Sequence, residues 1–199
     1  DDWMSNFFDK CKLISDDEMQ TMWSKILAGE SNKPGTFSKR TIEFMSTIDK
    51  NDAILFNDFC KLSWFTGEPQ AIIIDYDNPI YKKYNVTFDK LMHFEEMGLI
   101  SHNFSHGFAI GYTEGKVNIS YFGRILTIDI SDKKNIQIGS VRFSKIGKDI
   151  AIVSQPNIDK MIIESDEYID EYYHFIIKEL YKQKLIISEP LANKIYDKK

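Results

Sequence analysis

The hydrophobic pattern of the chain changes near residue 66, and this change limits the possible folds more than any other feature of the sequence. Before it, apolar residues recur at the spacing of helices; after it, β-branched and alternating runs stand between helical segments. This order predicts an α+β fold, with a helical unit over residues 1–65 and an α+β unit over residues 70–199.

The helical unit has its strongest signal at Ser15. Glu18 follows three residues later and completes a capping box, which is typical of a helix start. Apolar residues then recur at helical spacing until Gly29, which we expect to end this helix. Other helices are predicted to begin near Trp3, at Ser38, and at Asp49 or Asn51.

The second unit is predicted to begin with a buried strand over residues 71–76, a continuous and mainly β-branched run. Thr87 is expected to cap a helix that ends at Gly98. Partial alternation of apolar and polar residues then predicts strands between residues 101 and 143. The last predicted elements are a helix capped by Ser144, a long amphipathic helix over residues 166–184 and a strand over residues 185–188.

Residues 91–100 and 141–150 follow an order that resembles the winged-helix domain. A helix ends in Gly, an apolar pair begins a hairpin, and a strand leads into a capped helix. The strands between are longer than an ordinary wing, so an elaborated α+β domain is an equal alternative. We therefore expect a winged-helix-like α+β unit with an extended antiparallel β-hairpin region, a resemblance of shape that implies no function.

A denser pattern lies in the N-terminal segment. Its main parts are Asp1-Asp2-Trp3, Ser15 to Gln20, Ile26 to Glu30, Pro34 to Ser38 and Arg40-Thr41. Together they resemble the signature of the bacterial domain-of-unknown-function family numbered 2806, densely over residues 1–60 and more weakly over residues 85–185. The resemblance implies a bacterial or phage source, a longer parent chain with helical sequence upstream, and no established activity.

The charge balance argues against a general polyanion binder. The chain has 25 basic and 30 acidic residues and a net charge of −5, whereas nucleic-acid-binding domains carry a basic excess. Only residues 81–150 lean basic, with ten bases against seven acids. If this segment binds nucleic acid, the bases expected to touch phosphates are Lys82, Lys83, Arg124, Lys133, Lys134, Arg142, Lys145 and Lys148.

The sequence carries no recognisable catalytic or cofactor motif, such as G-x-S-x-G, H-E-x-x-H or G-x-G-x-x-G. Cys11 and Cys60 belong to no C-x-x-C pair, and we expect buried thiols in a reducing cytoplasm. His102 and His106 have the spacing of a helical metal pair, but the strand-like residues around them argue against a helix. We predict no catalytic residue, metal or cofactor. We also predict no membrane contact, because no apolar run reaches the length of a membrane span.

The loop after the first strong helix is a candidate binding site. Its backbone and the N–H groups that begin the next helix could hold an anion or a partner, with nearby bases to help. The residues of this candidate are Lys33, Gly35, Ser38, Lys39 and Arg40. The alternative interpretation is structural, with Gly35 serving the turn and Ser38 capping the helix.

The predicted helix over residues 166–184 has an aromatic stripe that is wider than one buried face requires. The residues at its sides, Tyr168, Tyr173 and Ile177, are predicted to form an interface. The leading hypothesis is therefore a non-enzymatic interaction or self-association module within a longer bacterial protein, linked to defence or stress. The expected partner is a protein, a second copy or the region upstream; nucleic-acid binding and an enzyme without a recognisable motif are the alternatives.

Overall fold

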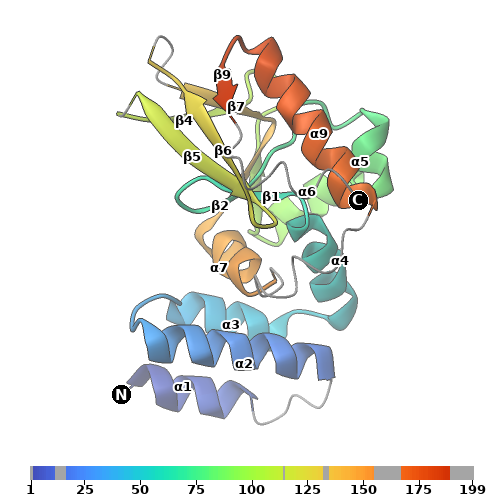
Figure 1. The fold of residues 1–199 in the computed structure, drawn as a ribbon. Helices are drawn as coiled ribbons and strands as arrows, with labels where there is room; N and C mark the ends of the chain where they lie inside the picture. The colour runs from blue at the N-terminus through green and yellow to red at the C-terminus, as the bar shows by residue number, and fades with distance from the viewer. Residues whose placement is uncertain (1, 12–16, 114, 132–134, 155–166, 189–199) are drawn as a thin grey trace.

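The computed structural model describes residues 2–11, 17–113, 115–131, 135–154 and 167–188. The predicted capping box at Ser15 lies outside them. The chain begins with the helices α1 (Asp2–Cys11), α2 (Asp17–Asn32), α3 (Lys39–Thr47) and α4 (Lys50–Cys60). Helices α1, α2 and α3 form one layer at the N-terminal end of the molecule, and α4 leads from this layer toward the strands (Figure 1).

The strands pair in antiparallel ladders. One sheet has the order β2 (Pro69–Ala71), β1 (Ser63–Phe65), β5 (Lys116–Tyr121), β6 (Arg124–Asp129) and β9 (Ile186–Ser188). Two further pairs are β3 (Ile100–His102) with β8 (Val141–Phe143), and β4 (Phe108–Gly111) with β7 (Asn135–Gly139). The other helices are α5 (Pro79–Lys83), α6 (Phe88–Glu96), α7 (Lys145–Ser154) and α9 (Glu167–Lys182). The predicted α+β fold, with helices first and antiparallel strands after them, is confirmed.

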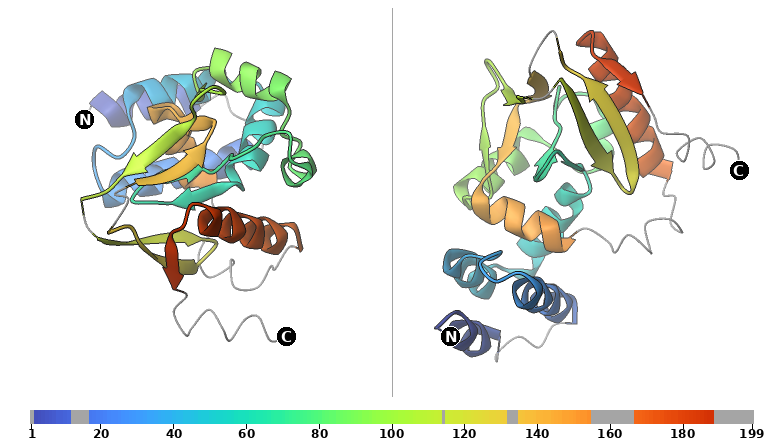
Figure 2. Two further views of the ribbon diagram at one scale, coloured as in Figure 1. Left: turned by 90° about the horizontal axis from the view of Figure 1, so that it is seen from above. Right: turned by 60° about the vertical axis from the view of Figure 1, so that its left-hand side comes forward.

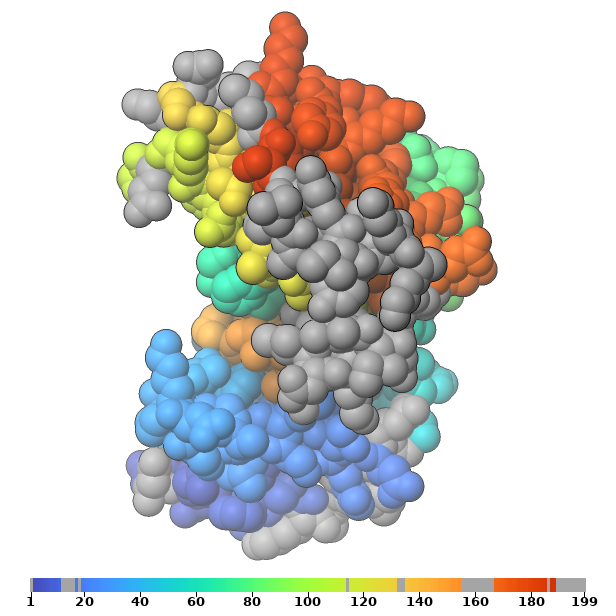
Figure 3. Space-filling view, in the orientation of Figure 1, coloured from blue at the N-terminus to red at the C-terminus, as the bar shows by residue number. Residues whose placement is uncertain are grey.

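Helix α7 connects the two parts of the molecule. It lies between the layer of N-terminal helices and the strands, as the right-hand view in Figure 2 and the space-filling view in Figure 3 show. It contacts α2, α3 and α4 on one side and β2 and β8 on the other. Buried apolar side chains form one continuous cluster that extends from Trp3 to Leu185. The helical layer and the α+β part therefore share a single core.

Two tyrosine hydroxyls hold the segment that follows β2. The Tyr172 hydroxyl on α9 lies 3.0 Å from the carbonyl oxygen of Leu62 and 2.8 Å from that of Ile72. The Tyr81 hydroxyl on α5 donates to the same Ile72 oxygen at 3.0 Å and accepts from the N–H of Ile74. These bonds satisfy backbone groups in the interior and fix α5 and α9 relative to the sheet.

The predicted helix starts agree with the structure where it describes them. Ser38 accepts a hydrogen bond from the N–H of Thr41 and caps α3, and Thr87 caps α6 in the same way. The Ser144 hydroxyl accepts from the N–H of Gly147 in the first turn of α7. Gly98 follows α6 with a φ of 74°, the left-handed conformation that a glycine C′ position adopts.

The predicted helix end at Gly29 is wrong, because α2 continues to Asn32. A Cβ atom at Gly29 would stand 2.7 Å from the ring carbon Cε2 of Phe37, and the Phe37 side chain is buried. The glycine is present because the Phe37 ring packs directly against the backbone of the helix. A close approach between backbone and ring thus explains a residue that resembles a helix stop.

The predicted strand over residues 71–76 is also mostly wrong. Strand β2 ends at Ala71, and beyond it Ile73 makes one isolated parallel bridge with Gly139. The chain then turns: the Asp75 carboxylate accepts from the N–H of Asp77, and Asn78 caps α5. Polar turn-forming residues therefore end the β structure before the β-branched run is complete. Strand β1, at residues 63–65, lies inside the stretch that was expected to be helical.

Candidate functional site

In the loop between α2 and α3, which carries the densest sequence motif, two backbone N–H groups donate to a carboxylate from the end of α2. Glu30, near the end of α2, is 9% exposed. Its Oε1 accepts a hydrogen bond from the N–H of Gly35 at 2.6 Å, and its Oε2 accepts from the N–H of Phe37 at 3.0 Å. Two backbone donors that an external anion would need are thus bound within the chain.

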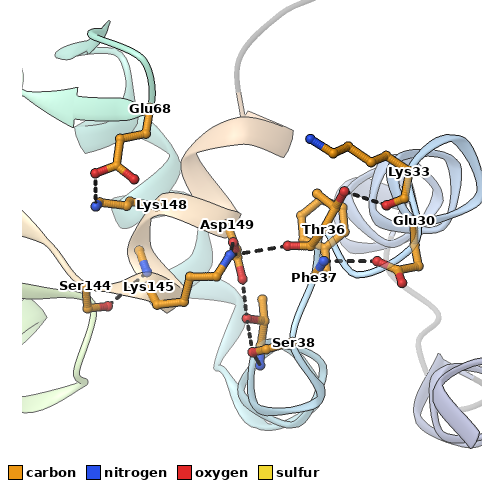
Figure 4. Close-up of polar contacts among 12 residues, drawn as sticks. Glu30, Lys33, Thr36, Phe37, Ser38, Glu68, Ser144, Lys145, Lys148 and Asp149 are labelled. Carbon is orange, nitrogen blue, oxygen red and sulfur yellow. Dashed lines mark hydrogen bonds and ion pairs between the residues drawn. The ribbon is translucent and has the colours of Figure 1, made fainter.

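A second carboxylate joins this loop to α7. Asp149 is 1% exposed, and its Oδ2 accepts from the Thr41 hydroxyl at 2.7 Å. Its Oδ1 pairs with Lys145, whose ammonium also donates to the carbonyl oxygen of Thr36. Figure 4 shows these contacts between the loop and the helix. The loop network is defined here as Glu30, Thr36, Ser38, Thr41, Lys145 and Asp149.

The loop network gives a structural explanation for the motif. Burying a carboxylate is costly unless it is paired and hydrogen-bonded, and Asp149 has both kinds of partner. In the candidate binding loop, Lys33, Gly35, Lys39 and Arg40 are exposed, and the Ser38 hydroxyl caps α3. The helix cap accounts for the serine, and the left-handed φ of 86° at Gly35 accounts for the glycine. Anion binding by the exposed lysines and arginine stays a prediction.

The structure buries two of the three residues of the interface predicted on α9. Tyr173 is 2% exposed and stacks on Trp64 with ring centroids 5.7 Å apart, and Ile177 is also buried. Only Tyr168 of the three residues is exposed, at 48%. The prediction is wrong for Tyr173 and Ile177, because α9 packs on β1 and β5 through Tyr173 and also contacts α5, so it buries a wider face than a helix with one neighbour. For Tyr168 it stays a prediction.

The candidate phosphate-binding bases fall into separate groups. Lys82 and Lys83 lie on α5, which packs against α9, and Lys83 pairs with Glu171 there. Arg124 also pairs with an α9 carboxylate, that of Asp170, and its guanidinium carbon lies 4.6 Å from the centre of the Tyr173 ring. The other described bases, Arg142, Lys145 and Lys148, lie together near the start of α7. Lys133 and Lys134 are outside the described residues.

Three aromatic rings meet at the surface near the start of α6. The ring centroids of Tyr76 and Phe104 are 4.9 Å apart, and those of Phe88 and Phe104 are 5.5 Å apart. Phe88 is 47% exposed, and the other two side chains are half-buried. They come from three segments: the turn before α5, the first turn of α6, and the connection between β3 and β4. We call these three residues the aromatic surface.

The histidines serve local contacts. His93 lies 2.8 Å from a carboxylate oxygen of Asp52, and His102 pairs with Glu95. The backbone N–H of His106 donates to Asn103 in a turn, so His102 and His106 do not share a helix. Across the part of the chain that the structure describes, no three His, Cys, Asp or Glu residues are grouped as metal ligands would be. None of the described helices is long and apolar enough to cross a membrane.

The two cysteines are free thiols. Cys60 is buried in the core, and burial raises the pKa of its thiol well above its usual range, because the thiolate would lose its hydration. Cys11 is half-buried and contacts the carbonyl oxygen of Phe8. A protonated buried thiol is a poor nucleophile, so Cys60 acts as a packing residue.

Comparison with known families matches residues 1–165 to the family described as a protein of unknown function (DUF2806). The chain belongs to this family. The match spans both sides of the loop network, from Glu30 to Asp149, so it covers more than the dense resemblance over residues 1–60. Neither the curated proteins nor the solved structures contain a match to the chain. Membership in this family therefore assigns no activity to the chain.

The aromatic surface was missed by sequence reasoning. Tyr76 was assigned to a buried strand, although Asp75 and Asp77 on both sides of it are exposed and favour a turn. Phe88 shares the helical stripe of Leu91 and Phe94, but it stands at the first position of α6, beyond the part of the helix that the core covers. The flanking aspartates were the signal that could have identified Tyr76 as a surface residue.

Proposed function

We propose that this member of the family is a non-catalytic protein-interaction module that binds its partner through the aromatic surface. One observation carries the proposal: three aromatic rings from separate segments meet at the surface, and one of them, Phe88, is 47% exposed. Exposed aromatic rings are enriched where proteins bind one another, because covering them removes a large apolar area from water. Isolated exposed side chains carry no such meaning, but a cluster does.

The charges around these rings favour a basic partner. Asp75 and Asp77 flank Tyr76, Asp89 follows Phe88, and all three carboxylates belong to exposed residues. A lysine or arginine from a partner would interact with the faces of the rings and with these carboxylates together. The occupant we propose is therefore a segment of another protein that combines basic and apolar side chains.

The winged-helix likeness supports a protein partner over nucleic acid. We take α6 as the counterpart of the helix that DNA-binding winged-helix domains insert into the major groove, because the elements follow the order α4, β1, β2, α5, α6 and then β3. The exposed residues of α6 include Asp89 and Glu96, whose charges would repel DNA phosphates. The bases that nucleic-acid binding would use also lie in separate places, and several of them pair with carboxylates of the chain.

A selection from a random peptide library against the purified chain tests the proposal. We expect the recovered peptides to be rich in lysine or arginine beside apolar residues, and to lose binding to the Phe88→Ser and Asp89→Lys variants. Tyr181→Ser is the matched control, because Tyr181 is 55% exposed on α9 and contributes nothing to the aromatic surface. The proposal fails if no peptide is recovered, if the peptides carry no basic excess, or if they bind Phe88→Ser as well as the unaltered chain.

A further inference from the structure

A groove beside the start of α7 is separate from the aromatic surface. Two adjoining cavities, of about 270 and 420 Å³, share Glu68, Phe108, Arg142 and Lys148 in their walls. The larger one also contacts Ser101 and Ser144. Strands β3, β4 and β8 contribute Ser101, Phe108 and Arg142, the turn between β1 and β2 contributes Glu68, and α7 contributes Lys148. We call this cavity pair the basic groove.

The cations of the basic groove differ in how they are neutralised. Lys148 is largely buried, with 15% of its side chain exposed, and pairs with Glu68, whose side chain is 62% exposed. Figure 4 shows this pair at the edge of α7. Arg142 is exposed, and among the described residues no carboxylate pairs with it. Lys145, at the rim, is held by Asp149.

We propose that the basic groove binds a small phosphate-bearing anion through Arg142 and Lys148, and that Glu68 is its internal competitor. The guanidinium group of Arg142 can hold two phosphate oxygens at once, and a lysine adds a point charge. Glu68 is mostly exposed, so its carboxylate can leave Lys148 for water at little cost, and a phosphate then takes its place.

Other groups in the groove suit such a ligand. The Ser144 hydroxyl accepts from the N–H of Gly147, which leaves its own proton free to donate to a phosphate oxygen. The half-buried Phe108 offers an apolar wall to an organic part of the ligand. A small ligand fits better than a nucleic acid, because the net charge of the chain is −5 and Lys82, Lys83 and Arg124 lie beside α9 instead of lengthening the groove.

Isothermal titration calorimetry with inorganic pyrophosphate at low salt tests this inference. We expect saturable binding at one site. Arg142→Gln should weaken it by about tenfold, because a charged hydrogen-bonding group is lost. Glu68→Gln should tighten it by about threefold, because the competing carboxylate is gone. The two substitutions move the affinity in opposite directions, which a general loss of folding cannot do.

Two controls separate the groove from the overall charge of the protein. Lys82→Gln removes a positive charge, and Glu167→Gln removes a negative one, both at exposed positions away from the groove. Neither should change the affinity by more than about twofold, since exposed charges at a distance are screened. The inference is overturned if pyrophosphate shows no saturable binding, if Glu68→Gln weakens binding, or if Lys82→Gln weakens it as much as Arg142→Gln.

A second titration uses a short single-stranded oligonucleotide and distinguishes a free anion from a nucleic acid. We expect the oligonucleotide to bind no more tightly than pyrophosphate, because the groove has too few cations to contact several successive phosphates of a nucleic-acid strand. If the oligonucleotide binds more tightly than pyrophosphate and Arg142→Gln weakens its binding by the same factor, the ligand of the groove is a nucleic acid and not a small anion. Neither result depends on the peptide experiment, which concerns other residues.

Discussion

The loop network and the aromatic surface differ in where their interacting groups find partners. In the loop network, Glu30 and Asp149 are buried and each accepts hydrogen bonds from within the chain. In the aromatic surface, Phe88 is about half exposed, and the neighbouring aspartates are exposed as well. The polar groups of the loop network, which has the densest motif, therefore stabilise the fold. The aromatic surface has no motif, but its exposed groups are available to a partner. A dense motif by itself does not identify a binding site.

The largest expected effect comes from removing the buried carboxylate of the loop network. Asp149→Ala removes an acceptor of the buried Thr41 hydroxyl and the carboxylate that pairs with the exposed Lys145, and it should lower the free energy of unfolding by about 2 kcal/mol. Asp149→Asn retains a hydrogen-bonding oxygen and should cost less. Urea unfolding followed by circular dichroism measures both. A cost below about 0.5 kcal/mol for Asp149→Ala would mean that the network does not join the two parts of the molecule.

The contrast between interior and surface also applies to the tyrosines. Burial raises the pKa of Tyr81 and Tyr172 above the usual value, because a buried phenolate lacks hydration. Below about pH 10 the phenolic protons stay bound in both the folded and the unfolded chain. Above that pH the unfolded chain releases them first, so the free energy of unfolding falls as the pH rises toward the pKa values of the folded chain. Tyr172→Phe should cost about 1 kcal/mol at pH 7 and make this alkaline fall less steep.

The control for the tyrosine prediction is Tyr181→Phe, since the Tyr181 ring is exposed on α9. It should leave both the stability at neutral pH and the alkaline slope unchanged. Unfolding in urea at a series of pH values between neutral and alkaline gives the two slopes. Equal slopes for Tyr172→Phe and the unaltered chain would show that the buried hydroxyl does not control the alkaline loss.

Gly29→Ala tests the packing that keeps α2 and the loop together. An alanine inside a helix ordinarily stabilises it, but here the new Cβ would stand 2.7 Å from the Phe37 ring. We expect a net loss of about 1 kcal/mol, because the buried ring has to move. The double variant with Phe37→Leu should lose less than the two single variants together. Thermal unfolding decides this, and a stabilised Gly29→Ala would contradict the close packing.

The smallest effect on stability is expected at the aromatic surface. Phe88→Ser should change the free energy of unfolding by less than about 0.5 kcal/mol, because the ring is half exposed and lies outside the main core. The same variant should nevertheless lose binding to the basic peptides. A large loss of stability would place Phe88 among the residues that maintain the fold and remove the contrast with the loop network.

Local signals predicted local structure well. Ser38, Thr87 and Ser144 cap helices, and Gly98 follows one, because these choices depend on the backbone of a few neighbouring residues. The α+β order followed from the change in hydrophobic spacing. These parts of the fold require no knowledge of what lies nearby in space.

Features that depend on distant neighbours were not predictable. Gly29 resembles a helix stop until Phe37 is seen against it, and the burial of Tyr173 requires Trp64 from another element. The aromatic surface likewise brings together three segments whose proximity no spacing reveals. The sequence identified a set of candidate phosphate-binding bases that includes those of the basic groove. It could not show that only some members of this set lie together.

Chemical-shift mapping with an isotope-labelled chain and a basic, apolar peptide compares the two regions directly. The account predicts that the shifted backbone resonances cluster at residues 75–77, 87–90 and 103–105, with none above the noise at residues 33–40. Shifts centred on residues 33–40, with residues 87–90 unaffected, would contradict it and make the loop the binding site.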